Sequence, residues 1–116
     1  MAFNIETDER VAIKILRERN NIDRYKLDTF LEEVRILTDV NHENVISIKY
    51  INMQGFYKKA NGQVYRVVYY VMELAEYGEL FNLLQNCRLS EKLARFYFHE
   101  LIIGKIELIK GWNICI

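Results

Sequence analysis

The stretch Arg10–Leu16, which reads RVAIKIL, places one lysine inside an otherwise apolar run from Val11 onward. Alternation along a β-strand puts Lys14 on the same face as Ala12 and Leu16. A buried ammonium is costly unless a negatively charged group meets it. The stretch therefore predicts a strand whose lysine has an acidic partner elsewhere in the chain.

The segments around this strand predict further strands and three helices. β-Branched and aromatic residues favour strands, three- and four-residue apolar spacing favours helices, and an Asn-Gly pair is a strong hairpin signal. The order of the elements predicts an α+β fold with a mainly antiparallel sheet. The expected elements are a strand from residue 2, a turn at 7–9, the strand at 10–16, a helix over 23–39, strands over 43–53 and 63–74 joined through Asn61-Gly62, a short helix ending near residue 87, and a long helix over 91–110 that Ser90 caps.

The helix predicted over residues 23–39 offers the acidic partner. Glu33 lies on the flank of its apolar stripe, whereas Glu32 points toward solvent, so Glu33 is the acid that can meet Lys14. Spacing alone leaves two alternatives open: a functional pair, or the commoner structural salt bridge or solvent-reaching lysine. The apolar stripe is expected to consist of Leu27, Phe30, Leu31, Val34 and Leu37.

Composition narrows the classes of function. The 116 residues suit one domain, and 16 basic residues balance 16 acidic ones, which disfavours nucleic acid or an anionic membrane as a partner. No secretory leader or membrane-spanning run is recognisable. Cys87 and Cys115 have no paired spacing and are interpreted as reduced thiols. We expect an intracellular, cytoplasmic protein without a metal site of its own.

Five stretches of the sequence occur in an order that is typical of one protein family. VAIK matches the lysine motif of the third kinase strand. FLEEVRIL resembles the C-helix, and NHENVISI resembles the segment that leads into the fourth strand. VYYVMELAEYGELFNLL resembles the fifth strand, hinge and D-helix, and LSEKLARFYFHELIIG resembles the E-helix. The last two are most similar to serine/threonine kinases of the calcium/calmodulin-dependent and related groups.

The resemblance implies a division of the chain. Residues 1–72 would form the kinase small lobe, an antiparallel sheet with one C-helix. Residues 73–79 would form the hinge, and residues 80–116 would form the D- and E-helices of an incomplete large lobe. The implied activity is transfer of the ATP γ-phosphate to protein serine or threonine, with magnesium as the metal used in the family.

The resemblance also implies roles for individual residues. Lys14 would grip the α- and β-phosphates of ATP while Glu33 holds it, and both would be catalytic. Leu37 and Ile48 match the small-lobe half of the family's apolar spine. The ATP-binding residues would be Ala12 at the adenine, Lys14 at the phosphates, Met72 as gatekeeper, Glu73 and Ala75 through backbone hydrogen bonds to the adenine edge, and Glu79 at a ribose hydroxyl.

Departures from the family pattern bear on activity. The sequence has no glycine-rich loop, no His-Arg-Asp catalytic loop and no Asp-Phe-Gly metal motif. After Gly104 the chain reads GKIELIKGWNICI, in which Lys105 looks inserted and Ile116 falls where the catalytic-loop histidine would start. We expect a truncated, pseudokinase-like chain that is inactive by itself and binds ATP weakly or not at all.

The last predicted helix leaves alternatives open. Its apolar residues cover most of its circumference, which is typical of a helix inside a larger body or at a partner surface. The chain is therefore a kinase piece acting with protein substrates or regulators, a non-catalytic binding module that uses this helix, or a truncated gene product without a selected function. His42 is expected to fix a loop, and His99 to lie at the surface.

Overall fold

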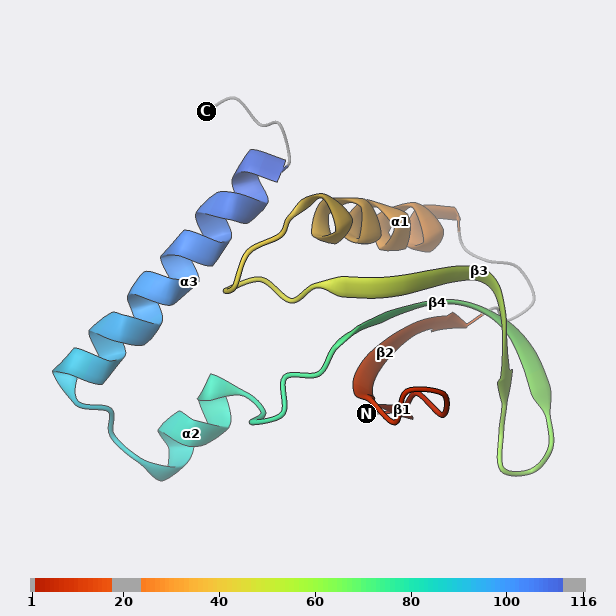
Figure 1. Cartoon of the computed structure of the whole chain (residues 1–116), viewed down its shortest axis with the longest axis horizontal. Coiled ribbons are helices and arrows are strands. Elements are labelled where there is room, and N and C mark those ends of the chain that lie inside the picture. The colour runs from red at the N-terminus through yellow and green to blue at the C-terminus, as the bar shows by residue number, and fades with distance from the viewer. Residues whose placement is uncertain (1, 18–23, 112–116) are drawn as a thin grey trace.

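Four strands form one twisted antiparallel sheet in the order β1-β2-β4-β3. The computed structural model in Figure 1 describes residues 2–17 and 24–111. The predicted α+β fold is confirmed. The elements are β1 Ala2–Phe3, β2 Arg10–Arg17, α1 Arg24–Asp39, β3 Ile48–Lys58, β4 Val64–Glu73, α2 Leu80–Asn86 and α3 Glu91–Gly111.

Strand β4 lies between β2 and β3, so its residues have cross-strand neighbours on both of these strands. Lys14 is opposite Tyr70 across the β2–β4 pair, and Ala12 is opposite Met72. Met72 is also opposite Ile48 on β3. The stretch Arg10–Leu16 therefore lies in a strand, as predicted, and this strand, β2, pairs with β1 on one side and with β4 on the other.

The hairpin between β3 and β4 forms at the Asn61-Gly62 pair, as predicted. Gly62 has a φ of +83°, a left-handed conformation that glycine adopts without a Cβ clash. Its N–H donates to the Lys59 carbonyl at 2.9 Å, and the Lys59 N–H donates to the Gln63 carbonyl at 2.8 Å. These two bonds close a hairpin loop that ends in a left-handed glycine, one of the common hairpin connections.

Helix α1 covers one face of the sheet, and the core lies between them (Figure 1). Its centre is a cluster of Phe30, Val34, Val68 and Tyr70, with Leu27 and Leu31 packed against it. The predicted stripe was incomplete, because Ile36 is also buried, whereas Leu37 is only half-buried. Ile36 lies on the side of α1 that faces α3, where a second element covers the helix.

The strand predicted over residues 43–53 was wrong at both ends, since β3 spans Ile48–Lys58. Residues 43–47 instead form a turn and the short connection to β3. His42 Nδ1 accepts the N–H of Asn44 at 3.1 Å, and the His42 carbonyl accepts the N–H of Val45 at 3.0 Å. His42 thus fixes this loop, as expected. Its side-chain bond to the backbone competes with strand pairing, so β3 begins only at Ile48.

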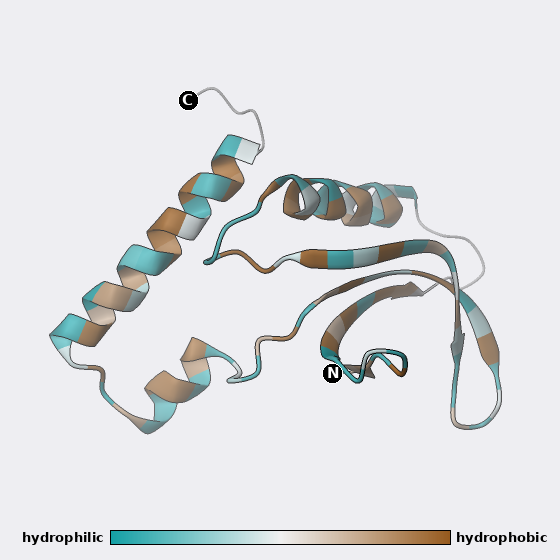
Figure 2. Ribbon diagram, viewed as in Figure 1, coloured by the Kyte–Doolittle hydropathy of each residue, from teal (hydrophilic) through white to brown (hydrophobic). Residues whose placement is uncertain are grey.

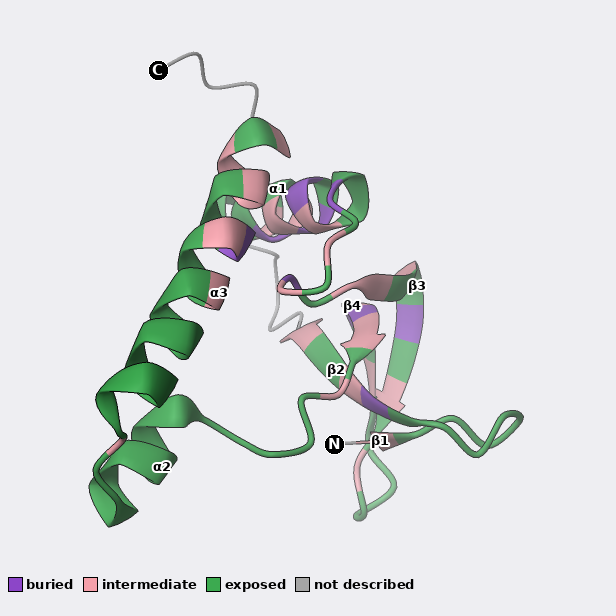
Figure 3. Cartoon of the chain, turned by 60° about the vertical axis from the view of Figure 1, so that its left-hand side comes forward, coloured by how far each residue is buried: buried purple, intermediate pink, exposed green. Residues whose placement is uncertain are grey.

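Helices α2 and α3 extend away from the sheet (Figures 1 and 3). Ser90 Oγ accepts the N–H of Leu93 at 3.3 Å, which confirms Ser90 as the N-cap of α3. Near the other end of α3, buried Gly104 lies against the loop before β3, and Asn44 Nδ2 donates to Glu100 Oε2 at 2.5 Å. One end of α3 is therefore fixed to the small sheet unit.

The apolar side chains of α2 and α3 are largely exposed, as the sequence predicted for the last helix. Figure 2 shows hydrophobic positions on several sides of α3, and Figure 3 shows most of α2 and the first half of α3 as exposed. None of the described helices combines the length and the hydropathy that a membrane crossing requires. The exposed large apolar residues of these helices include Phe81, Leu84, Phe96, Phe98, Leu101 and Ile106.

Candidate functional site

Lys14 and Glu33 meet where β2 passes beneath α1. Lys14 Nζ is 2.7 Å from Glu33 Oε1 and 2.5 Å from Oε2, so the ammonium faces both carboxylate oxygens. The Lys14 side chain is 48% exposed and that of Glu33 37%, so the lysine pairs with the predicted acid and also reaches solvent. The ion pair is therefore partly accessible to solvent.

Tyr70 completes the cluster, and sequence reasoning missed it. Its side chain is the most deeply buried large one described, with 1% exposure, and its hydroxyl donates to Glu33 Oε1 at 2.8 Å. The Lys14 ammonium lies 5.9 Å from the centre of its ring. A signal was available, because Tyr70 shares a strand face with Met72, and a tyrosine on a core face needs a partner for its hydroxyl.

The hydrogen bonds of this cluster keep Glu33 ionised. Partial burial alone would raise the pKa of Glu33, but the hydrogen bonds from Lys14 and Tyr70 and the charge of Lys14 outweigh it, so the pKa lies below its ordinary value. Burial and the neighbouring Glu33 carboxylate raise the pKa of the Tyr70 hydroxyl, which therefore remains a donor. At neutral pH the cluster holds one carboxylate between an ammonium and a phenol.

The predicted adenine residues divide into two groups. Ala12 and Met72 are direct neighbours across β2 and β4, two residues along each strand from Lys14 and Tyr70. Glu73 ends β4, and its carboxylate accepts hydrogen bonds from the backbone N–H and the hydroxyl O–H of Ser47 at 3.2 and 3.3 Å. The structure thus brings the two apolar residues beside the lysine and gives the Glu73 side chain a partner on the loop before β3.

The remaining two predicted residues lie in the connection after β4. Ala75 is exposed, and Glu79 precedes α2 at its N-cap position without a side-chain capping bond. Glu79 lines a groove between α2 and α3 together with Tyr77 and Leu83, and not the cluster around Lys14. Arg10 on β2 reaches Glu76 in the same connection at 3.4 Å, which links the strand to this segment.

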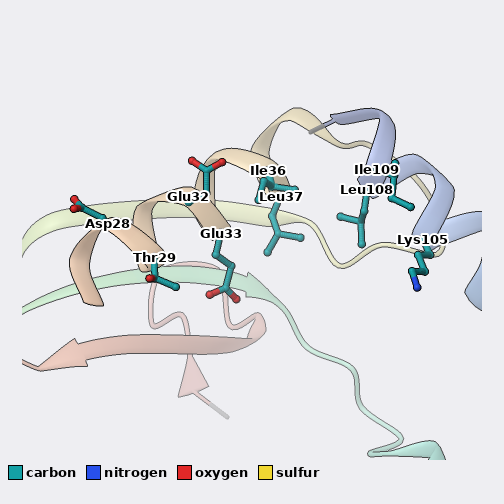
Figure 4. A pocket seen from close by; sticks show the side chains of 9 residues that line it. All are labelled: Asp28, Thr29, Glu32, Glu33, Ile36, Leu37, Lys105, Leu108 and Ile109. Atoms are coloured by element: carbon teal, nitrogen blue, oxygen red, sulfur yellow. The ribbon is translucent and has the colours of Figure 1, made fainter. Parts of the chain in front are cut away.

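A second groove, of about 870 Å³, separates α1 from α3. Figure 4 shows the Glu33 carboxylate pointing from α1 toward the sheet, with Leu37 beside it and Leu108 projecting from α3 toward α1; Lys105 on α3 also lines the groove. The groove therefore adjoins the Lys14–Glu33 pair on the side opposite β2. Glu33 belongs both to the ion pair with Lys14 and to the lining of this groove.

The family model for the protein kinase domain matches residues 1–109 of the chain. The chain belongs to the protein kinase family. The observed fold agrees with this assignment, since the kinase chain has an antiparallel sheet with one packed helix, followed by a connection and two further helices. Within this kinase fold, VAIK lies on β2 and FLEEVRIL on α1, where the family places its lysine and its C-helix glutamate.

Relatives of the kinase chain are protein kinases, including one that is named a serine/threonine kinase. It is 33% identical over 102 residues to CBL-interacting serine/threonine-protein kinase 12 of Arabidopsis thaliana, covering 88% of the chain and 19% of that relative. It is 35% identical over 101 residues to CBL-interacting protein kinase 2 of Oryza sativa subsp. japonica, covering 87% and 20%. It is 33% identical over 111 residues to calcium/calmodulin-dependent protein kinase type II of Schizosaccharomyces pombe, covering 94% and 19%.

The kinase chain therefore spans about one fifth of the length of the curated relatives it matches. No solved structure shows a significant match to it. The predicted similarity to calcium/calmodulin-dependent and related kinases is confirmed by these relatives.

Other predicted residues of the kinase chain fall outside this cluster. His99 is a surface residue, as expected, with its side chain 70% exposed and its Nδ1 3.3 Å from Glu100 Oε1. Cys87 is an exposed free thiol, whereas Cys115 and Ile116 lie outside the described residues. The described part of the chain contains no group of three His, Cys, Asp or Glu side chains arranged for a metal ion.

Proposed function

We propose that this chain is the ATP-binding part of a serine/threonine protein kinase, in which Lys14 contacts the α- and β-phosphates. The observation that carries the proposal is the Lys14–Glu33 pair, with both carboxylate oxygens within 2.7 Å of the ammonium. Among the described residues, the hydrogen bonds of Lys14 go to Glu33 alone. The family match and the serine/threonine kinase relatives support the choice of ligand.

The chemistry of the pair suits a phosphate. A lysine ammonium has three N–H donors, so two can face Glu33 while the third meets a phosphate oxygen. Glu33 holds the flexible lysine side chain in one place, which lowers the entropy lost when the phosphate binds. Phosphoryl transfer depends mainly on positioning and electrostatic stabilisation, and a held cation supplies both.

The strand neighbours of Lys14 suit the adenine. Ala12 and Met72 lie side by side on β2 and β4, and both are half-buried. The small alanine leaves room for a flat ring, and the methionine gives it an apolar contact. In this proposal the connection after β4, with Glu73 and Ala75, offers backbone groups to the adenine edge, and Glu79 contacts the ribose.

An ATP-dependent thermal shift tests this proposal. ATP should raise the melting temperature of the chain, and Lys14→Ala should remove that rise because the phosphate loses its cation. Lys49→Ala is a matched control, since Lys49 is also an ion-paired lysine of the sheet but contacts Glu9. Without an ATP effect on the wild-type chain, or with the same effect in Lys14→Ala, the pair would be purely structural.

We further propose that these 116 residues do not transfer phosphate by themselves. Lys14 and Glu33 position a nucleotide, but the sequence has no His-Arg-Asp or Asp-Phe-Gly motif to supply a base and a magnesium ligand. We assign no magnesium ligand to the described residues. Incubation of the purified chain with labelled ATP, magnesium and a generic protein substrate should give no phosphoprotein, and turnover above that of Lys14→Ala would contradict this.

A second candidate function is a non-catalytic protein-binding module. The observation that favours it is the apolar surface of α3, where Phe96, Phe98 and Leu101 are 55%, 64% and 64% exposed. Exposed apolar surface of this kind is typical of a partner site. A monodisperse monomer in light scattering that binds no hydrophobic dye would count against this function and would leave the ATP proposal standing.

A further inference from the structure

We propose that Tyr70 is a positioning residue for the Lys14–Glu33 pair: its buried hydroxyl holds the Glu33 carboxylate toward β2 so that the lysine is pre-arranged for phosphate. This inference rests on the proposed function for its consequence in ATP binding. The geometric part concerns the described side chains alone and has a separate readout.

The tyrosine hydroxyl is fixed in space by the core. The Tyr70 ring is 1% exposed, and its centre lies 5.1 Å from that of Phe30 on α1. Lys14 is the residue opposite Tyr70 in the β2–β4 strand pair. A ring held on β4 by a neighbour from α1 has little freedom, so its hydroxyl is a rigid reference point for Glu33.

Glu33 Oε1 is where the two donors meet. It accepts the Tyr70 hydroxyl at 2.8 Å and the Lys14 ammonium at 2.7 Å, and Oε2 accepts Lys14 at 2.5 Å. One donor alone would leave the carboxylate free to rotate about its last bond. A second donor from another strand fixes the plane of the carboxylate, and therefore the place of the ammonium.

The surroundings of Glu33 explain why such a contact matters here. Glu33 also lines the groove between α1 and α3, although its carboxylate points toward the sheet. The titratable and charged groups around it are Lys14 from β2, Tyr70 from β4, Lys105 across the groove on α3, and Asp28 and Glu32 on its own helix. Lys105 is a second cation that lines the same groove from α3, so a fixed hydroxyl from β4 favours Lys14 as the partner of Glu33.

The ion pair is too exposed to hold this geometry strongly by itself. Side chains that are 48% and 37% exposed gain little from their mutual attraction, because water screens the charges. The hydroxyl of Tyr70, by contrast, is inside the core and loses a partner if Glu33 turns away. The cost of an unpaired buried hydroxyl therefore keeps Glu33 in place.

Tyr70→Phe tests the proposal, because it removes the hydroxyl and keeps the ring that packs on Phe30. We expect the pKa of Glu33, followed by its side-chain carbon resonance in NMR, to rise relative to the wild-type chain. We also expect ATP to bind roughly three- to tenfold more weakly, which corresponds to the net contribution of one ordinary hydrogen bond. Tyr69→Phe is the matched control, since Tyr69 is the neighbour on β4 whose ring covers Gly55, and it should change neither quantity.

The two readouts separate this inference from the proposed function. If the wild-type chain shows no ATP effect, the proposed function fails, and the Glu33 titration still decides the role of Tyr70. An unchanged Glu33 pKa in Tyr70→Phe overturns the inference, whatever ATP does. If Tyr70→Phe does not fold, Glu33→Gln replaces it: the Tyr70 ring-carbon resonance next to the hydroxyl should then shift and that of Tyr69 should not, and an unchanged Tyr70 resonance overturns the inference.

Discussion

Three elements of the chain meet at the carboxylate of Glu33. The lysine comes from β2, the carboxylate of Glu33 from α1 and the hydroxyl of Tyr70 from β4. Because the ion pair is partly exposed and the phenol is buried, the cluster is reachable on one side and fixed on the other. This combination suits a residue that must be both held and available to a ligand.

The stability of the chain should fall in acid partly through Glu33. Its pKa in the folded chain lies below the ordinary value of 4.5, so the folded state binds the proton less tightly than the unfolded state. The stabilisation is therefore present above pH 4.5 and is lost as the pH falls through the lower folded value. Since both partners are more than a third exposed, we expect a contribution of at most about 1 kcal/mol.

Urea unfolding between pH 3 and pH 7 measures this contribution. Glu33→Gln should be less stable than the wild-type chain at pH 7, and the difference should shrink toward pH 3. Glu43→Gln removes an exposed carboxylate from the loop after α1 and serves as the control. A difference between Glu33→Gln and wild type that stays constant across this range would contradict the assignment.

The Lys14–Glu33 pair could be predicted from the sequence, but its exposure to solvent and its contact with Tyr70 could not. Helical spacing separated Glu33 from Glu32 correctly, since Glu32 instead contacts Arg35 on the solvent side of α1. The exposure of Lys14 could not be predicted, because it depends on how far α1 extends over β2. Tyr70 could have been inferred from its strand face, but its partner depends on the depth at which α1 packs.

Among the elements, α3 depends on one close contact with the small sheet unit. A Cβ at Gly104 would lie 2.8 Å from the carbonyl oxygen of Asn44, closer than real Cβ atoms approach. Asn44 also contacts α3 through its side-chain bond to Glu100. The glycine therefore allows a helix backbone to lie directly against the loop before β3.

Gly104→Ala should destabilise the chain although it improves helix propensity. Alanine is favoured over glycine in a helix interior by about 1 kcal/mol, so propensity alone predicts a gain. The clash with Asn44 predicts the opposite sign, because a backbone atom must move. Thermal unfolding followed by circular dichroism measures the result.

Lys92→Ala is the control for this change, since Lys92 is exposed on the same helix. It should leave the melting temperature nearly unchanged. A higher melting temperature for Gly104→Ala would mean that α3 does not depend on the close contact at Asn44.

Element types could be predicted more reliably than their bounds. The hairpin at Asn61-Gly62 and the cap at Ser90 were predictable because both signals are local. The start of β3 was not, since the bond from the Asn44 N–H to His42 competes with strand pairing. Burial of Ile36 depends on α3, which lies more than 50 residues further along the chain.

Over the whole molecule, the described core lies on one side. Its central cluster combines residues of α1 and β4, whereas every residue of α2 is exposed. Figure 3 shows the same contrast, with buried positions at α1, at the sheet and where α3 lies against them, whereas α2 is exposed. Local stability should therefore differ between the two parts of the chain.

Hydrogen exchange should reveal this difference directly. Backbone amides of α1 and β4 should exchange slowest, because their exposure requires opening of the core, and those of α2 should exchange fastest. Mass spectrometry of peptides covering residues 24–39, 64–73 and 80–86 measures the three rates. Equal protection of all three peptides would show that α2 is held as firmly as the core.

The strand order has a consequence for how the sheet closes during synthesis. Strand β2 ends at Arg17, but its partner β4 begins only at Val64 and is made after β3. At roughly 5–20 residues per second, one edge of β2 waits roughly 2–10 seconds on the ribosome before its partner is made. An unpaired strand edge is a template for another chain. A translational pause before Val64 would therefore lengthen the interval in which nascent chains can pair with one another through β2.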